Sequence, residues 1–144
     1  MFLSQKLIEL IERNADELAR RWLSDVQTHV GTPTYHSYDE KELYRRAFDV
    51  YSRLGDWLSQ KTTREEIAKV YTDMGKERRK EGFSLSEVIQ ALITTRRHIW
   101  LKVLEEGLLD TALQMYQAID LINRVVLFFD RAIYFTAVGY ESND

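Results

Sequence analysis

Residues 82–88, Gly-Phe-Ser-Leu-Ser-Glu-Val, decide the fold because they end one helix and begin the next. Gly82 suits the left-handed conformation that follows a helix C-terminus. Ser84 and Glu87 have the spacing of a capping box, and Phe83 and Val88 that of a hydrophobic staple. The stretch therefore predicts two long helices joined by a tight corner.

Working outward from this corner, apolar residues recur with helical periodicity along the whole chain, and no stretch has the pattern of a β-strand. The only proline of the chain, Pro33, follows the first helical pattern. We expect five helices: about Gln5 to Val30, Asp39 to about Gln60, Thr63 to Glu81, Ser84 to near Gly107, and Asp110 or Thr111 to about Val138.

The helices predict an all-α domain that spans residues 1–144. Residues 31–38 form the main loop, and residues 139–144 a flexible tail toward a possible effector domain. Short connections favour a five-helix bundle, with either globin-like or four-helix-bundle-like packing. The pattern does not choose between these two arrangements.

Composition excludes several classes of protein. The net charge of −3 gives no basic surface for nucleic acid, and the absence of cysteine excludes disulfides and thiolate metal sites. No apolar run approaches the ~18 residues of a membrane span. We expect a cytoplasmic protein.

The last helix carries two apolar stripes, so it is either buried at the centre of the fold or packed against a second copy of the chain. Both arrangements are compatible with one molecule. The stripe that we select as the candidate dimer interface contains Leu121, Val125, Phe128, Ala132 and Phe135.

Two arginines lie within apolar helix faces, Arg78 before the corner and Arg96 after it. A buried guanidinium needs a partner. One possibility is an ion pair with Asp49, Asp120 or Asp130. The other is a pocket for a small anionic or polar ligand, because arginine binds carboxylate or phosphate through two donors. The candidate ligand-binding residues are Arg78, Arg96, Tyr71 and Trp100.

No catalytic motif is present, and we predict neither an enzyme nor a metal site or cofactor. The histidines at positions 29, 36 and 98 have no metal-binding spacing. A haem ligand would have to face the core, whereas the helical pattern places His98 on the polar face. A haem or small-molecule cofactor sensor of globin type remains the alternative function.

The run from Met74 to Val88, followed by Arg96, Arg97 and Trp100, resembles a known family. It looks like the N-terminal sensory domain of RsbRD-type RsbT co-antagonists, which also precedes bacterial histidine kinases. The segment Phe128-Phe129-Asp130-Arg131-Ala132 and Tyr140 are similar to the family's last helix. The resemblance covers most of residues 38–140.

The resemblance implies a globin-related helical bundle without haem that senses a signal and is commonly dimeric. The predicted function is a non-catalytic sensory or regulatory module of a bacterial stress-response or histidine-kinase system. A small ligand near Arg78 and Arg96, or a partner protein, would change the packing of the last helix. That helix would pass the change to an effector domain or a second subunit.

Overall fold

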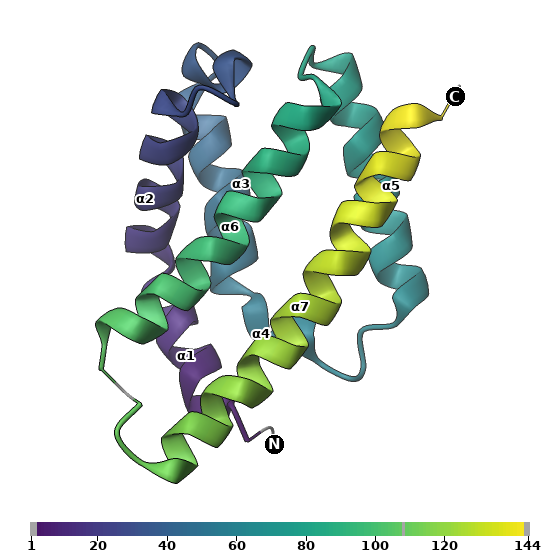
Figure 1. Cartoon of the computed structure of the whole chain (residues 1–144). Helices are drawn as coiled ribbons and strands as arrows, with labels where there is room; N and C mark the ends of the chain where they lie inside the picture. The colour runs from purple at the N-terminus through teal and green to yellow at the C-terminus, as the bar shows by residue number, and fades with distance from the viewer. Residues whose placement is uncertain (1–2, 108, 143–144) are drawn as a thin grey trace.

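The computed structural model describes residues 3–107 and 109–142, and these ranges are helical, with no β-strand. Figure 1 shows the order of the elements along the chain. They are α1 (Gln5–Arg13), α2 (Ala15–Thr28), the 3-10 turn η1 (Pro33–His36), α3 (Glu40–Ser52), α4 (Leu54–Leu58), α5 (Arg64–Lys80), α6 (Leu85–Glu105) and α7 (Ala112–Glu141). The all-helical prediction is confirmed, whereas the globin-like packing stays a prediction.

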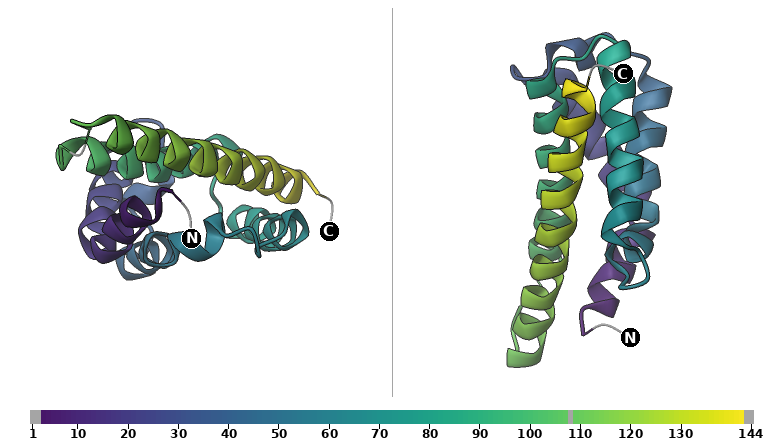
Figure 2. Two further views of the ribbon diagram at one scale, coloured as in Figure 1. Left: turned by 90° about the horizontal axis from the view of Figure 1, so that it is seen from below. Right: turned by 90° about the vertical axis from the view of Figure 1, so that its right-hand side faces the viewer.

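The helices form two layers. Helices α6 and α7 run antiparallel on one side of the molecule, α3, α4 and α5 lie on the other, and α1 and α2 close one edge (Figure 2). In the described ranges, no helix is long and apolar enough to cross a membrane.

Two of the five expected helices are each divided into two. The first breaks at Asn14, whose side-chain amide donates to the Leu10 carbonyl oxygen at 2.7 Å and competes with the helical backbone bonds there. The second breaks at Arg53, directly before the short helix α4. The second break lets Gly55 approach α1, where its backbone N–H donates to the Glu12 carboxylate at 2.9 Å.

The corner at residues 82–88 has the predicted geometry. Gly82 has a φ of 94°, and Ser84 and Glu87 form the capping box of α6. The Glu87 carboxylate also accepts hydrogen bonds from the backbone N–H and the hydroxyl of Thr34, at 2.6 and 2.9 Å. One carboxylate therefore begins α6 and ties the loop around η1 to it. At the start of α3, Asp39 and Glu42 have capping-box spacing but form no capping box, because Asp39 accepts from Lys41 N and Glu42 pairs with arginines.

The stripe expected to form a dimer interface lies inside the chain. Leu121, Val125, Phe128 and Ala132 are each 5% exposed or less, and Phe135 is half-buried. These side chains pack against the molecule's own core, so the structure corrects their assignment.

Helix α7 also continues beyond Val138 to Glu141, into the segment expected to be a tail; residues 143 and 144 lie outside the described ranges.

Helices α5 and α7 run in the same direction and touch through their backbones (Figure 1). A Cβ atom added at Gly75 would lie 2.1 Å from the Thr136 carbonyl oxygen, and one added at Gly139 would lie 1.9 Å from the Thr72 carbonyl oxygen. No side chain fits at either position. The two glycines therefore set the distance between α5 and α7, and we call this contact the glycine seam.

Replacing Gly75 by alanine should force α5 and α7 apart. Because the obstruction is backbone, we expect Gly75→Ala to lower the free energy of unfolding by roughly 3 kcal/mol, as measured by urea denaturation. Gly55→Ala is the matched control in a helix, because its nearest neighbour is the movable end of the Glu12 side chain. Equal stability of the two variants would contradict the role assigned to the seam.

Candidate functional site

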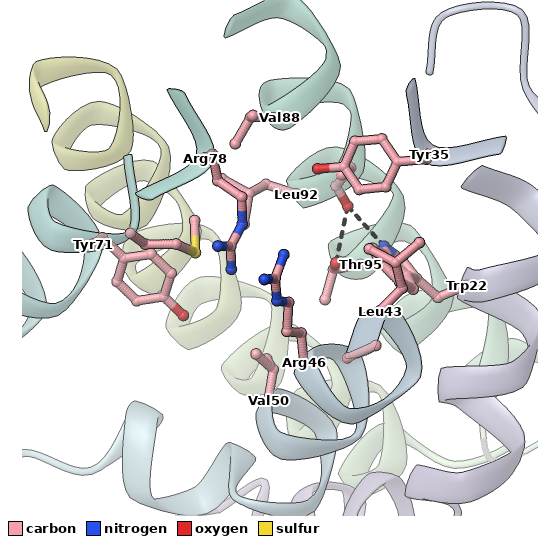
Figure 3. A pocket seen from close by; sticks show the side chains of 13 residues that line it. Trp22, Tyr35, Leu43, Arg46, Val50, Tyr71, Arg78, Val88, Leu92 and Thr95 are labelled. Carbon is pink, nitrogen blue, oxygen red and sulfur yellow. Dashed lines mark hydrogen bonds between the residues drawn. The ribbon is translucent and has the colours of Figure 1, made fainter. Parts of the chain in front are cut away.

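A cavity of ≈ 80 Å³ lies between α2, α3, α5 and α6 and is not closed off from solvent. Most of its lining is apolar, but two arginines from different helices enter it. Arg46 comes from α3 and Arg78 from the last turn of α5 (Figure 3). In the figure, their guanidinium groups point toward one another across the middle of the cavity.

Both arginines share one carboxylate, that of Glu81. Arg46 binds it through both terminal nitrogens, at 3.0 and 2.6 Å, and Arg78 Nη1 binds it at 3.1 Å. Arg46 also donates to Glu42 at 3.1 Å, and Glu42 is shared in turn with Arg45. The side chains of Arg46, Arg78 and Glu81 are only 18%, 14% and 20% exposed. The cavity therefore holds a largely buried cluster with more arginines than acids.

This crowding shifts the pKa of each group. Burial, together with the charge of Arg46, lowers the pKa of the Arg78 guanidinium. Burial alone would raise the pKa of Glu81, but the hydrogen bond from Arg46 and the charge of Arg78 outweigh it and leave the pKa below its ordinary value. The hydrogen bond from Arg45, helped by Arg46, lowers the pKa of Glu42 to about 2. Both carboxyl groups are ionised at neutral pH.

Two tyrosines complete the polar part of the lining. Tyr35 and Tyr71 are each 3% exposed, and burial raises the pKa of both hydroxyl groups, so they stay neutral. Within the described part of the chain, neither hydroxyl makes a hydrogen bond to the protein. On the opposite wall the Ala91 carbonyl accepts from Trp22 Nε1 at 3.0 Å and from Thr95 Oγ1 at 2.9 Å, which holds α2 against α6 (Figure 3).

The four predicted ligand-binding residues divide between two places. Arg78 and Tyr71 line this cavity, whereas Arg96 and Trp100 line a separate groove between α6 and α7. The partner of Arg78 is Glu81 and none of the aspartates considered from the sequence. Arg46 was not among the predicted residues, although its position three residues after the apolar Leu43 and directly before Ala47 places it beside that helix face.

The α6–α7 groove opens on the outward face of that layer. Ile122 and Val126 of α7 line it and are 36% and 41% exposed, and Arg96 and Arg97 of α6 border it. Ile119 on α7 and Leu104 on α6 are also exposed, at 53% and 45%. Asp130, whose charge is opposite to that of Arg96 and Arg97, is also exposed, one turn along α7 from Val126. We call this surface the outer apolar face.

The sequence predicted that His98 lies on a polar helix face. This prediction is wrong, because the residue is buried, with only 7% of its surface exposed. Its Nε2 lies 2.6 Å from the Asp25 carboxylate of α2, and this pairing explains the burial. Among the described residues that line the arginine cavity there is no histidine. The described ranges also contain no group of acids and histidines arranged to hold a metal ion.

Comparison with known families identifies the chain. Residues 16–143 match the family described as the RsbT co-antagonist protein rsbRD N-terminal domain. The chain belongs to this family. No curated protein and no solved structure gives a significant match. The resemblance seen in the corner sequence is therefore confirmed, and membership indicates a regulatory module of stress-response signalling.

The range matched to the rsbRD N-terminal domain begins inside α2 and extends through α7. It contains the arginine cavity, the glycine seam and the outer apolar face. Helix α1 precedes the match but belongs to the same core, through Leu7, Ile8 and Ile11. The three features therefore lie together in the part of this rsbRD N-terminal domain that is shared with its family.

Glu81 should matter most to stability at neutral pH. Glu81→Gln leaves two mostly buried guanidinium groups without their shared counter-charge, so we expect a loss on the order of 3 kcal/mol in the free energy of unfolding. Glu77→Gln, an exposed glutamate of the same helix, is the control and should change stability little.

The effect of Glu81→Gln should depend on pH. Because the folded-state pKa of Glu81 lies below the ordinary value of 4.5, its stabilising effect is complete above pH 4.5 and disappears as the pH falls through the depressed pKa. Denaturation of both proteins between pH 3 and 7 measures this, and the difference between them should shrink toward acid. A difference that stays constant over this range would show that the charge of Glu81 is not the cause.

Proposed function

We propose that this domain is a non-catalytic, cytoplasmic sensory module of a bacterial stress-response or histidine-kinase signalling protein. In this proposal the arginine cavity receives the signal, and α7 carries it to an effector or a second subunit. Family membership supports the regulatory role. The observation that carries the proposed route is the glycine seam, since it joins α5, one of the helices that line the cavity, to α7.

Adjacent faces of α5 serve the two ends of this route. Tyr71, Met74 and Arg78 line the cavity, while Thr72 and Gly75 touch the backbone of α7. Tyr71 also packs edge-on against Phe128 of α7, with ring centroids 5.7 Å apart. Because a backbone contact has no side chain to absorb movement, a shift of α5 at the cavity must displace α7.

The C-terminal end of α7 is tied to the same region. Arg79 donates to the carbonyl oxygens of Tyr140 and Ser142, at 3.1 and 2.9 Å. The Tyr140 hydroxyl donates to the Phe83 carbonyl oxygen of the corner at 2.7 Å. The last turn of α7 is therefore bonded to Arg79, which directly follows Arg78, and to Phe83, two residues after Glu81. These bonds support the transmission of a change in the arginine cluster to the helix end.

Hydrogen exchange tests this route. Arg78→Met removes one guanidinium from the cavity, and we expect the amides of residues 136–142 to exchange at least threefold faster relative to those of α1. Mass spectrometry of deuterated peptides gives the rates. Arg20→Met, which removes an exposed arginine whose ion pair is with the exposed Asp16, is the control and should leave the ratio unchanged. A change confined to α3 and α5 would argue against α7 as the output.

The outer apolar face supports dimerisation through a second copy of the chain. A symmetric pair of α6–α7 layers would cover Ile119, Ile122 and Val126 in a four-helix seam. In this pair the two α7 helices would run antiparallel and cross at Val126, so that Asp130 of one copy lies beside Ile122 of the other. Ile122 lines the same groove as Arg96 and Arg97, so the Asp130 carboxylate would lie near these two arginines. This charge complementarity favours a second copy as the occupant.

Light scattering with size-exclusion chromatography tests the dimer. The 17.1 kDa chain should elute with twice its mass at micromolar concentration, and Val126→Glu should weaken the dimer at least tenfold by placing two carboxylates at the crossing point. Val70→Glu is the matched control, because Val70 is a similarly exposed helical valine on α5. A wild-type chain that stays monomeric at high micromolar concentration would remove dimerisation from the proposal.

A further inference from the structure

We infer that the arginine cavity binds a small organic monocarboxylate with a short apolar chain. Arg46 and Arg78 would hold the carboxylate, and the apolar wall would hold the chain. The inference names the class of signal for the proposed sensory function and rests on it for its biological meaning. The binding itself stands on the geometry of the cavity alone.

The first argument is charge. The two guanidinium groups of the cavity share the single carboxylate of Glu81, which itself is not part of the cavity lining. The other acid in contact with Arg46, Glu42, is divided between Arg46 and the exposed Arg45. One positive charge therefore lacks a counter-charge of its own. A bound monoanion neutralises it, whereas a dianion such as phosphate would leave one negative charge uncompensated in a mostly buried site.

The second argument is unused hydrogen-bonding capacity. Within the described structure, Arg78 makes one side-chain hydrogen bond, from Nη1, although a guanidinium carries five N–H donors. Among the described residues, the hydroxyl groups of the buried Tyr35 and Tyr71 also have no hydrogen-bond partner in the protein. Figure 3 shows the two guanidinium groups directed toward the same central space. A carboxylate there would accept from both arginines in the geometry that guanidinium groups favour.

The third argument is size. A volume of ≈ 80 Å³ has room for roughly six water molecules, which suits an acid of three to five carbon atoms. The walls beside the arginines are apolar and include Val50, Met74, Val88 and Leu92. Apolar walls favour a hydrocarbon chain over additional hydroxyl or amino groups, because these would find few partners. Butyrate is therefore a suitable probe, with an expected Kd on the order of 1 mM.

Titration of the wild-type protein decides the inference. We expect sodium butyrate to shift the side-chain Nε–H NMR signals of Arg46 and Arg78 in a saturable manner, with the ionic strength held constant by sodium chloride. Butyramide has the same shape without the charge and should bind at least tenfold more weakly. Equal shifts from butyrate, butyramide and chloride would overturn the inference, and this comparison needs no variant.

Two variants locate the binding. Arg78→Met should weaken butyrate binding at least tenfold, while Arg97→Met, which changes an arginine of the α6–α7 groove, should leave it unchanged. Glu81→Gln removes the competing carboxylate and should tighten binding several-fold. Weaker binding after Glu81→Gln, or an equal loss in both arginine variants, would show that butyrate binds elsewhere.

These outcomes separate the inference from the proposed function. Suppose that the wild-type protein does not bind butyrate, but that it still dimerises and that Arg78→Met still speeds exchange in residues 136–142. This result would reject the ligand class and keep the sensory route. Butyrate binding that leaves the exchange of residues 136–142 unchanged would keep the ligand site and reject the route through the glycine seam.

Discussion

The backbone contact between α5 and α7 is the constraint on which the rest of the structure depends. Gly75 and Gly139 place the carbonyl groups of each helix against the other helix with no side chain between them. Because neither position accepts a Cβ atom, the separation of the two helices has a single value. Helix α5 in turn carries Tyr71, Met74 and Arg78 into the cavity, so the seam fixes α7 against a helix that lines the candidate site.

The arginine cluster beside this seam is costly to bury, and as a whole it adds little net stability, although removing one member alone destabilises the fold. Desolvation of two guanidinium groups and one carboxylate offsets much of their attraction, and an apolar cluster of the same volume would often be as stable. Nearby, Phe83, Val88 and Tyr51 already give the bundle a continuous apolar core. The presence of excess positive charge in such a place is therefore better explained by recognition of an anion than by stability.

Helix α7 has two apolar sides, and the fold gives them different roles. Leu121, Val125 and Phe128 face inward and complete the core, whereas Ile122 and Val126 face outward beside α6. Helix α7 thus contacts α5 and the core, and it also forms part of the outer apolar face. In the proposed function, a displacement of α7 at the glycine seam would change the geometry of that outer surface as well.

The sequence by itself determined the features that depend on near neighbours in the chain. The corner at residues 82–88 was predictable because the capping box and the left-handed Gly82 use residues at most three positions apart. The helical class and the inward position of Arg78 followed from periodicity, and the family from a short run of residues around the corner. Tertiary structure decided the rest. The two stripes of α7 are equally apolar, so only packing selects the inner one. Arg46 and Arg78 meet although 32 positions of sequence separate them, while Arg78 and Arg96 diverge because they belong to different helices that face different spaces. Local chemistry determines where helices begin and end, and only the approach of distant helices determines which charges share a cavity.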